Sequence, residues 1–222
     1  MYDKGDTMQH DLIKLKTELD MNKYSLKDLA LFFEKYDGYV YEIKTTQRIL
    51  KFKIEANSLP HLIGLQHAFK GKKNKNKYKG ASGFAKIKNG ELTYNDVMKS
   101  IKNNHNDKIE WSNIKNRIKY MPMFLNTITS NNTKLKIRDN YLISRKIFMN
   151  GNYFLYKSLS DNKYPMFSLK KVNNEKVVIE TFIVDNDISL LGALKNEEIV
   201  SIKVFAPLNK TNITTKKEYI KN

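Results

Sequence analysis

Hydrophobic residues follow a helical period through most of the first 130 residues of the chain. Residues 8–36 carry two apolar stripes at this spacing, which predicts two helices. The second stripe begins after Ser25, and Ser25 with Asp28 fits a capping box in which Asp replaces the usual Glu or Gln. Asp37-Gly38 is a helix-ending signal, so the second helix is predicted to stop there.

Three more helical segments are predicted before residue 133, where the strand pattern of apolar residues begins to dominate. One is capped by Ser58, carries Pro60 in its first turn and extends to about Phe69. Another starts at Thr93. The last covers residues 108–128, where Pro122 is expected to kink or interrupt the helix.

The apolar period changes to two in the remaining segments, which predicts strands. Residues 39–44 and 48–54 flank a short turn, so they are predicted to form a hairpin. From residue 133 onward almost every apolar segment has the strand pattern. The strands predicted there are residues 134–137, 141–147, 153–158, 166–172, 177–183 and 199–204.

Asn150-Gly151 and Asn173-Asn174 are turn signals between adjacent strands of this region, and such hairpins join antiparallel neighbours. Helices followed by hairpins indicate an α+β fold, with N-terminal helices packed on a mainly antiparallel β-sheet. No internal repeat is found. We expect a helical extension over residues 1–38, an α+β domain over 39–209 and a basic tail over 210–222.

The formal net charge of +17 favours a polyanionic partner such as RNA, DNA or an anionic membrane surface. No segment has the pattern of a basic amphipathic anchor, so a membrane partner is not expected. The basic residues are nearly all lysine, with only four arginines, and asparagine is abundant. An AT-rich genome would produce that bias without selection for binding, so incidental basicity stays open as an alternative.

The absence of cysteine excludes disulfides, thiolate zinc sites and cysteine nucleophiles. No apolar segment approaches the ~20 residues of a membrane span. The residues Met1–Asp6 lack the apolar core of a signal peptide. We therefore expect a cytoplasmic protein.

Two of the four histidines, His61 and His67, lie in the helix predicted to begin near Pro60. They are six positions apart, which would place them on different faces of one helix, and no His-Glu-x-x-His pattern is present. Hence neither a metal site nor another cofactor is expected. Gly80–Phe84 is predicted to be a small-residue bend, not a phosphate-binding loop, and no other nucleotide-binding motif occurs.

These residues suit a metal-independent acid–base cleavage of RNA, in which the 2′-hydroxyl of the substrate is the nucleophile. Such a site needs a proton acceptor, a proton donor and cations around the phosphate. His61 and His67 are candidates for the proton transfers. Arg145 and Lys157 are candidates for the phosphate charge, and Thr181 could orient the substrate through its hydroxyl. Each residue also has a structural explanation, as a surface histidine or as part of a solvated strand face.

The segment from residue 70 to residue 80 has six lysines and no apolar period, so we expect a loop that contacts the RNA backbone. The lysines concerned are Lys70, Lys72, Lys73, Lys75, Lys77 and Lys79. A solvated loop with no ligand is the alternative.

Leu59-Pro60-His61-Leu62-Ile63-Gly64-Leu65 follows a predicted hairpin and precedes the lysine-rich loop, Lys88–Tyr94, and hairpins that end in Glu180-Thr181-Phe182. In this order and pattern the chain resembles the fourth phage-associated family of barnase–EndoU–colicin–RelE-like nucleases over about residues 39–205. The resemblance implies helices packed on an antiparallel sheet and metal-independent RNA cleavage. It also implies that His61 is catalytic and that Thr181 is a late-strand hydroxyl of the site.

Gln66-His67 stands where the family pattern would place a second basic residue, and the final strand region has no clear histidine, so the second proton carrier stays unassigned. Our hypothesis is a metal-independent endoribonuclease that acts as a toxin or as a phage or mobile-element defence effector. Its substrate would be RNA, tRNA included, and an antitoxin, either protein or RNA, would be a partner.

The alternative is a non-catalytic protein that binds nucleic acid or another partner on the same scaffold. A nucleotidyl- or ADP-ribosyl-transferase would require a nucleotide pocket that the sequence does not indicate.

Overall fold

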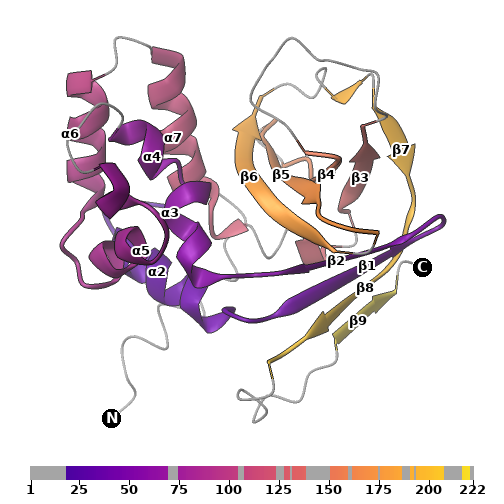
Figure 1. Cartoon of the computed structure of the whole chain (residues 1–222). Coiled ribbons are helices and arrows are strands. Elements are labelled where there is room, and N and C mark those ends of the chain that lie inside the picture. Colours follow the sequence, from indigo (N-terminus) through magenta and orange to yellow (C-terminus); the bar gives the residue numbers. More distant parts are fainter. Residues whose placement is uncertain are drawn as a thin grey trace. The chain divides into compact units, whose positions relative to one another are not determined.

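The structure is a computed structural model of the chain (Figure 1). It divides into two compact units. The helical unit comprises Met1–Asp37 and Glu55–Phe124, and the β unit comprises Gly38–Ile54 and Leu125–Asn222. The residues that the structure describes are 19–69, 75–104, 108–123, 128–130, 132–138, 151–159, 162–174, 176–186, 191–192, 194–207 and 217–220.

Short helices build the helical unit. Within the described residues they are α2 (Leu26–Lys35), η1 (Ala56–Ser58), α3 (Leu59–Leu62), α4 (Leu65–Ala68), η2 (Lys75–Tyr78), α5 (Gly80–Lys88), α6 (Tyr94–Asn104) and α7 (Lys108–Tyr120). As predicted, α7 ends two residues before Pro122, because proline cannot continue the hydrogen-bond ladder. The predicted helix at residues 8–18 lies outside the described residues.

Two helices begin with reciprocal hydrogen bonds. At α2 the Asp28 backbone N–H donates to Ser25 Oγ at 3.2 Å, and the Ser25 N–H donates to Asp28 Oδ2 at 2.7 Å. Thr93 and Asp96 make the same pair of bonds at the start of α6. The predicted capping box at Ser25 and the predicted helix start at Thr93 are therefore confirmed.

Gly80–Phe84 is a correction to the sequence analysis, because it forms the first half of α5 and not a bend. The small residues serve close packing. A Cβ atom at Gly83 would lie 2.6 Å from the carbonyl oxygen of Tyr78, so only glycine lets α5 approach the backbone of η2 this closely.

Strands build the β unit, and within the residues that the structure describes every pair of neighbouring strands in the two sheets is antiparallel. The strands are β1 (Val40–Thr45), β2 (Ile49–Lys53), β3 (Lys134–Ile137), β4 (Tyr153–Tyr156), β5 (Tyr164–Lys171), β6 (Val177–Asp185), β7 (Lys195–Glu197), β8 (Ile199–Phe205) and β9 (Lys217–Ile220). Helices together with antiparallel sheets confirm the predicted α+β class.

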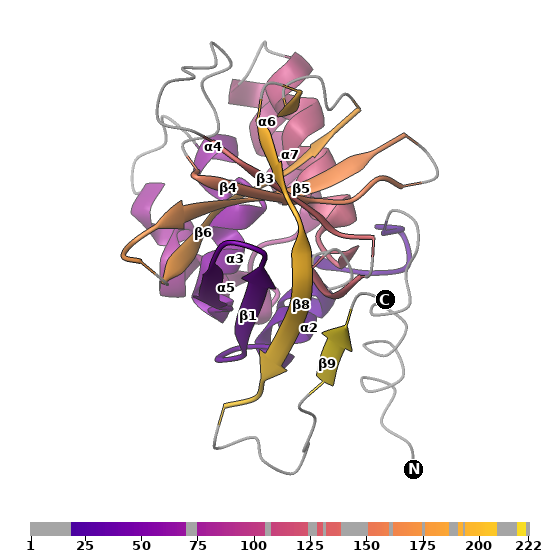
Figure 2. The same cartoon turned by 90° about the vertical axis from the view of Figure 1, so that its right-hand side faces the viewer.

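The first sheet has four strands in the order β2-β1-β8-β9, and Figure 2 shows β8 between β1 and β9. The predicted hairpin β1–β2 is confirmed, with Ile43 opposite Leu50. The last strand, β9, lies within the segment predicted as a tail. Its sequence is too short and too polar to predict a strand, and β8 supplies the hydrogen-bonding partner.

The second sheet has five strands in the order β6-β5-β4-β3-β7. The predicted hairpin around Asn173-Asn174 is confirmed as β5–β6, whose rings Phe167 and Phe182 stack with centroids 4.8 Å apart. Phe154 of β4 and Met166 of β5 belong to a buried hydrophobic cluster of this unit. The predicted strand 141–147 lies outside the described residues.

An ion pair connects the two sheets of the β unit. Arg48, in the turn between β1 and β2, donates from Nε to Glu197 Oε1 at 3.1 Å, and its Nη2 lies 3.0 Å from Oε2. The Glu197 side chain is only 1% exposed and also accepts a hydrogen bond from Thr45 Oγ1. Burial by itself would lower the pKa of Arg48, but a hydrogen bond with Tyr153 and the charge of Glu197 raise it overall. The guanidinium is therefore held as a cation against a buried carboxylate.

Candidate active site

The segment that carries both predicted catalytic histidines forms two short helices instead of the single helix expected. Helix α3 has Pro60 in its first turn, as predicted. Ser58 does not cap it, however, because its hydroxyl donates to the Glu55 carbonyl oxygen at 2.6 Å. The hydroxyl therefore stabilises the preceding turn η1, and the prediction that Ser58 caps the helix is wrong.

Gly64 separates the two helices. Its φ of +81° and ψ of 23° lie in the left-handed region, which ends α3 and lets α4 start in a new direction. The Gly64 N–H donates to the His61 carbonyl oxygen and the His67 N–H donates to the Gly64 carbonyl oxygen, both at 3.0 Å. The argument that His61 and His67 occupy different faces of one helix is therefore wrong, because no single helix contains both.

Gln66 lies between the two imidazoles and connects them. Its Oε1 is 2.8 Å from His61 Nδ1, and its Nε2 is 3.4 Å from His67 Nε2. With the amide in this orientation, its oxygen accepts a hydrogen bond from the His61 Nδ1–H, and its nitrogen donates a hydrogen bond to the unprotonated His67 Nε2. In its neutral form His61 then has its lone pair on Nε2. All three side chains are half-buried.

Arg117 brings a positive charge to the same place from α7. A Cβ atom at Gly64 would lie 3.6 Å from Arg117 Nη1, 3.7 Å from Arg117 Cδ and 3.2 Å from Ile114 Cγ1. The half-buried guanidinium therefore packs against the residue whose backbone joins both histidines. We call His61, Gln66, His67 and Arg117 the histidine cluster.

Sequence reasoning missed two members of this cluster. Gln66 was noted only as a departure from the family pattern, and its contacts with two side chains could not be read from its position in the chain. Arg117 is one of only four arginines, and that scarcity was the one signal available for it.

Replacing Gly64 with alanine is expected to lower the free energy of unfolding by about 2–3 kcal/mol. The new side chain would be forced into the left-handed region and would also press on Ile114 at 3.2 Å. Gly90→Ala is the matched control, because Gly90 has a φ of +77° and no atom within 4 Å of its Cβ position. Urea denaturation of both variants should show a larger loss for Gly64→Ala; equal losses would mean that the contact with Ile114 adds nothing to the cost of the left-handed backbone.

The other predicted catalytic residues belong to the β unit. Thr181 lies in β6 opposite Ser168 and is only 8% exposed. Lys157 directly follows β4 and is half-buried. Arg145 lies outside the described residues. The histidine cluster contains none of the three, and their roles stay predictions.

The predicted RNA-binding lysines fall in and around η2. Lys77 and Lys79 are exposed, and Lys75 is the first residue of η2. Lys70, Lys72 and Lys73 lie outside the described residues. Among the described residues, no three His, Asp or Glu side chains gather as a metal site would require, and no described helix is long and apolar enough to cross a membrane.

Comparison with protein families gives one match. A family model described as phage-Barnase-EndoU-ColicinE5/D-RelE like nuclease4 matches residues 25–221, which include segments of both units. It confirms the resemblance seen in the sequence and extends its range at both ends. No curated protein and no solved structure matches the chain.

Proposed function

Because the chain belongs to this family of phage-associated barnase–EndoU–colicin–RelE-like nucleases, we propose that it is a metal-independent endoribonuclease whose acid–base residue is His61. A nucleic-acid substrate follows from the family. The observation that supports His61 is its 2.8 Å hydrogen bond to Gln66, which fixes the orientation of the ring and the nitrogen that carries the proton.

In the proposed reaction His61 Nε2 takes the proton of the ribose 2′-hydroxyl. The 2′-oxygen forms a bond to phosphorus, the bond from phosphorus to the 5′-oxygen breaks, and the departing oxygen takes a proton from water. The products are a 2′,3′-cyclic phosphate and a 5′-hydroxyl end. Gln66 keeps the proton of the neutral imidazole on Nδ1, in the way that an orienting partner fixes the tautomer of a catalytic histidine.

Negative charge grows on the phosphoryl oxygens during this step, and a nearby cation lowers its energy. Arg117 is the cation of the histidine cluster, and its planar guanidinium can bind two phosphoryl oxygens at once. His67 Nε2 accepts from the Gln66 amide only while it carries no proton, so His67 is proposed to orient Gln66, and the second proton carrier stays unassigned.

The proposal keeps the biological setting inferred from the sequence. The enzyme would act on RNA, tRNA included, as a toxin or as a phage or mobile-element defence effector, and an antitoxin of protein or RNA would restrain it. The family's phage association supports this setting. Lys157, Thr181 and Arg145 remain predicted contributors.

The test is incubation of the purified full chain with total tRNA, and with a DNA oligonucleotide, in buffer that contains EDTA. We expect discrete RNA fragments ending in 2′,3′-cyclic phosphate and intact DNA, since DNA lacks the 2′-hydroxyl nucleophile. Cleavage that requires added Mg²⁺, or cleavage of both polymers, would contradict the mechanism. Intact RNA would instead support the non-catalytic binding protein.

A further inference from the structure

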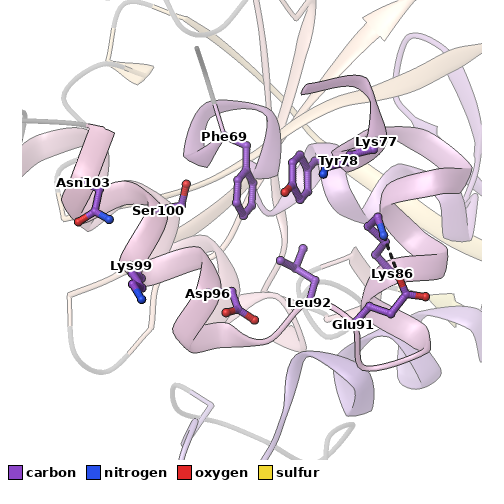
Figure 3. A pocket seen from close by; sticks show the side chains of 10 residues that line it. All are labelled: Phe69, Lys77, Tyr78, Lys86, Glu91, Leu92, Asp96, Lys99, Ser100 and Asn103. Atoms are coloured by element: carbon purple, nitrogen blue, oxygen red, sulfur yellow. Dashed lines mark hydrogen bonds and ion pairs between the residues drawn. The ribbon is translucent and has the colours of Figure 1, made fainter. Parts of the chain in front are cut away.

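A polar pocket of about 410 Å³ lies in the helical unit, beside the end of α4 (Figure 3). Phe69, which directly follows α4, forms one wall, and Ser100 of α6 is tied to the same place because its hydroxyl donates to the Ala68 carbonyl oxygen at 2.8 Å. The pocket therefore begins two residues after His67 in the chain. Its volume is within the range of pockets that bind small organic ligands.

Two aromatic rings form the centre of this pocket. Phe69 and Tyr78 stack with centroids 3.8 Å apart and an interplanar angle of 6°. Phe69 is 3% exposed and Leu92 below it is 5% exposed, whereas Tyr78 is half-buried. Figure 3 shows the two rings side by side with Leu92 beneath them. Because Phe69 is buried and covers one face of Tyr78, the exposed part of the Tyr78 ring is the aromatic surface that could stack a planar ligand.

Lysines approach the rings from opposite sides. Lys99 comes from α6 on one side, and Lys77 and Lys86 come from η2 and α5 on the other (Figure 3). Lys86 is paired with Glu91 at 2.7 Å, and this contact lowers the pKa of Glu91 and raises that of Lys86. Lys77 Nζ lies 5.3 Å from the Tyr78 ring centroid, and Lys77 and Lys99 are both exposed.

The carboxylate of Asp96 accepts hydrogen bonds from the backbone N–H and the hydroxyl of Thr93 at the start of α6. Hydrogen bonds from Thr93 lower its pKa most, and the charge of Lys99 contributes less. Three lysines against two carboxylates leave the pocket with an excess positive charge. The amide of Asn103, on the α6 side, adds donors and an acceptor that could read the edge of a base.

We propose that this pocket binds one unpaired nucleotide of the RNA substrate, with its base against Tyr78 and its flanking phosphates at Lys77 and Lys99. A nucleotide inside a strand has a phosphate on each side, which matches lysines on opposite sides of an aromatic surface. This inference rests on the proposed ribonuclease function, because it places part of the same substrate within the helical unit that carries His61.

The test is binding of a short fluorescein-labelled 2′-O-methyl RNA of mixed sequence to the full chain, followed by fluorescence anisotropy. This probe lacks the 2′-hydroxyl nucleophile, so binding is measured whether or not the protein is a nuclease. Lys99→Ala is expected to weaken the Kd about tenfold and to reduce the slope of log K against log salt by about 0.7. Lys102→Ala is the matched control, because Lys102 is an exposed lysine of the same helix that does not line the pocket.

Tyr78→Leu should also weaken binding about tenfold through lost stacking, whereas Tyr78→Phe, which keeps the ring, should bind as the native chain does. Equal effects of Lys99→Ala and Lys102→Ala, or unchanged binding by Tyr78→Leu, would overturn the inference. Thermal melts of each variant separate lost contacts from lost folding, and Lys99→Ala alters only an exposed side chain. If the native chain leaves natural RNA intact while Lys99→Ala selectively weakens binding, the proposed ribonuclease function fails and the pocket remains.

Discussion

His61→Ala is expected to lower the rate of RNA cleavage by about 100- to 10,000-fold, the contribution typical of one general acid–base group. Alanine removes the imidazole that is proposed to take the 2′-hydroxyl proton, and it leaves Gln66 without its 2.8 Å partner. The rate should be measured under single-turnover conditions with a labelled RNA in EDTA. Circular dichroism of the variant should be native, because His61 is only half-buried.

Variants of Gln66 separate catalysis by His61 from its positioning. Gln66→Leu removes the acceptor for His61 Nδ1 and should slow cleavage at least about tenfold, since a small misorientation of a catalytic group is costly. Gln66→Glu keeps an acceptor oxygen for His61 Nδ1 and should retain most of the activity that Gln66→Leu loses. If Gln66 had only a structural role, Gln66→Leu and Gln66→Glu would cleave RNA at the same rate when their free energies of unfolding are equal. If His61→Ala cuts RNA as fast as the native chain, the histidine cluster is not the active site, and the predicted residues Lys157 and Thr181 should be tested next.

Arg48→Met is expected to lower the free energy of unfolding by about 3–4 kcal/mol, the largest stability effect that we predict. Methionine keeps much of the side-chain volume but removes the cation that lies 3.0 Å from Glu197 Oε2. The Glu197 carboxylate, 1% exposed, would then be buried without its cation, although the Thr45 hydroxyl would still donate to it, at the junction of the two sheets. Urea denaturation followed by circular dichroism would measure the loss.

Lys51→Met provides the matched control, because Lys51 lies in β2 of the same hairpin and pairs with Glu42 at 3.4 Å. Its side chain is 42% exposed, and exposed ion pairs contribute only about 0–1 kcal/mol. A loss for Arg48→Met no larger than that for Lys51→Met would show that Glu197 does not depend on Arg48 for its burial. The contrast between the two variants therefore tests burial, not charge alone.

The class of the fold and much of its local structure could be predicted from the sequence alone. The strand pattern of apolar residues predicted β1, β2, β3, β4, β5, β6 and β8, and side-chain oxygens three residues apart predicted the capping box at Ser25. These strands and the capping box depend on residues that are only a few positions apart, so the sequence pattern predicts them directly. The order of such segments around Pro60–Leu65 was also enough to identify the family.

Which side chains come into contact depends on the tertiary structure. One left-handed residue, Gly64, divides the predicted helix and brings Gln66 between His61 and His67, although the spacing of the two histidines argued for separation. Arg117 reaches Gly64 from a helix more than 40 positions away, and Glu197 reaches Arg48 across nearly 150 positions. Contacts at such separations depend on how whole elements pack, and no local period of hydrophobic residues encodes that packing.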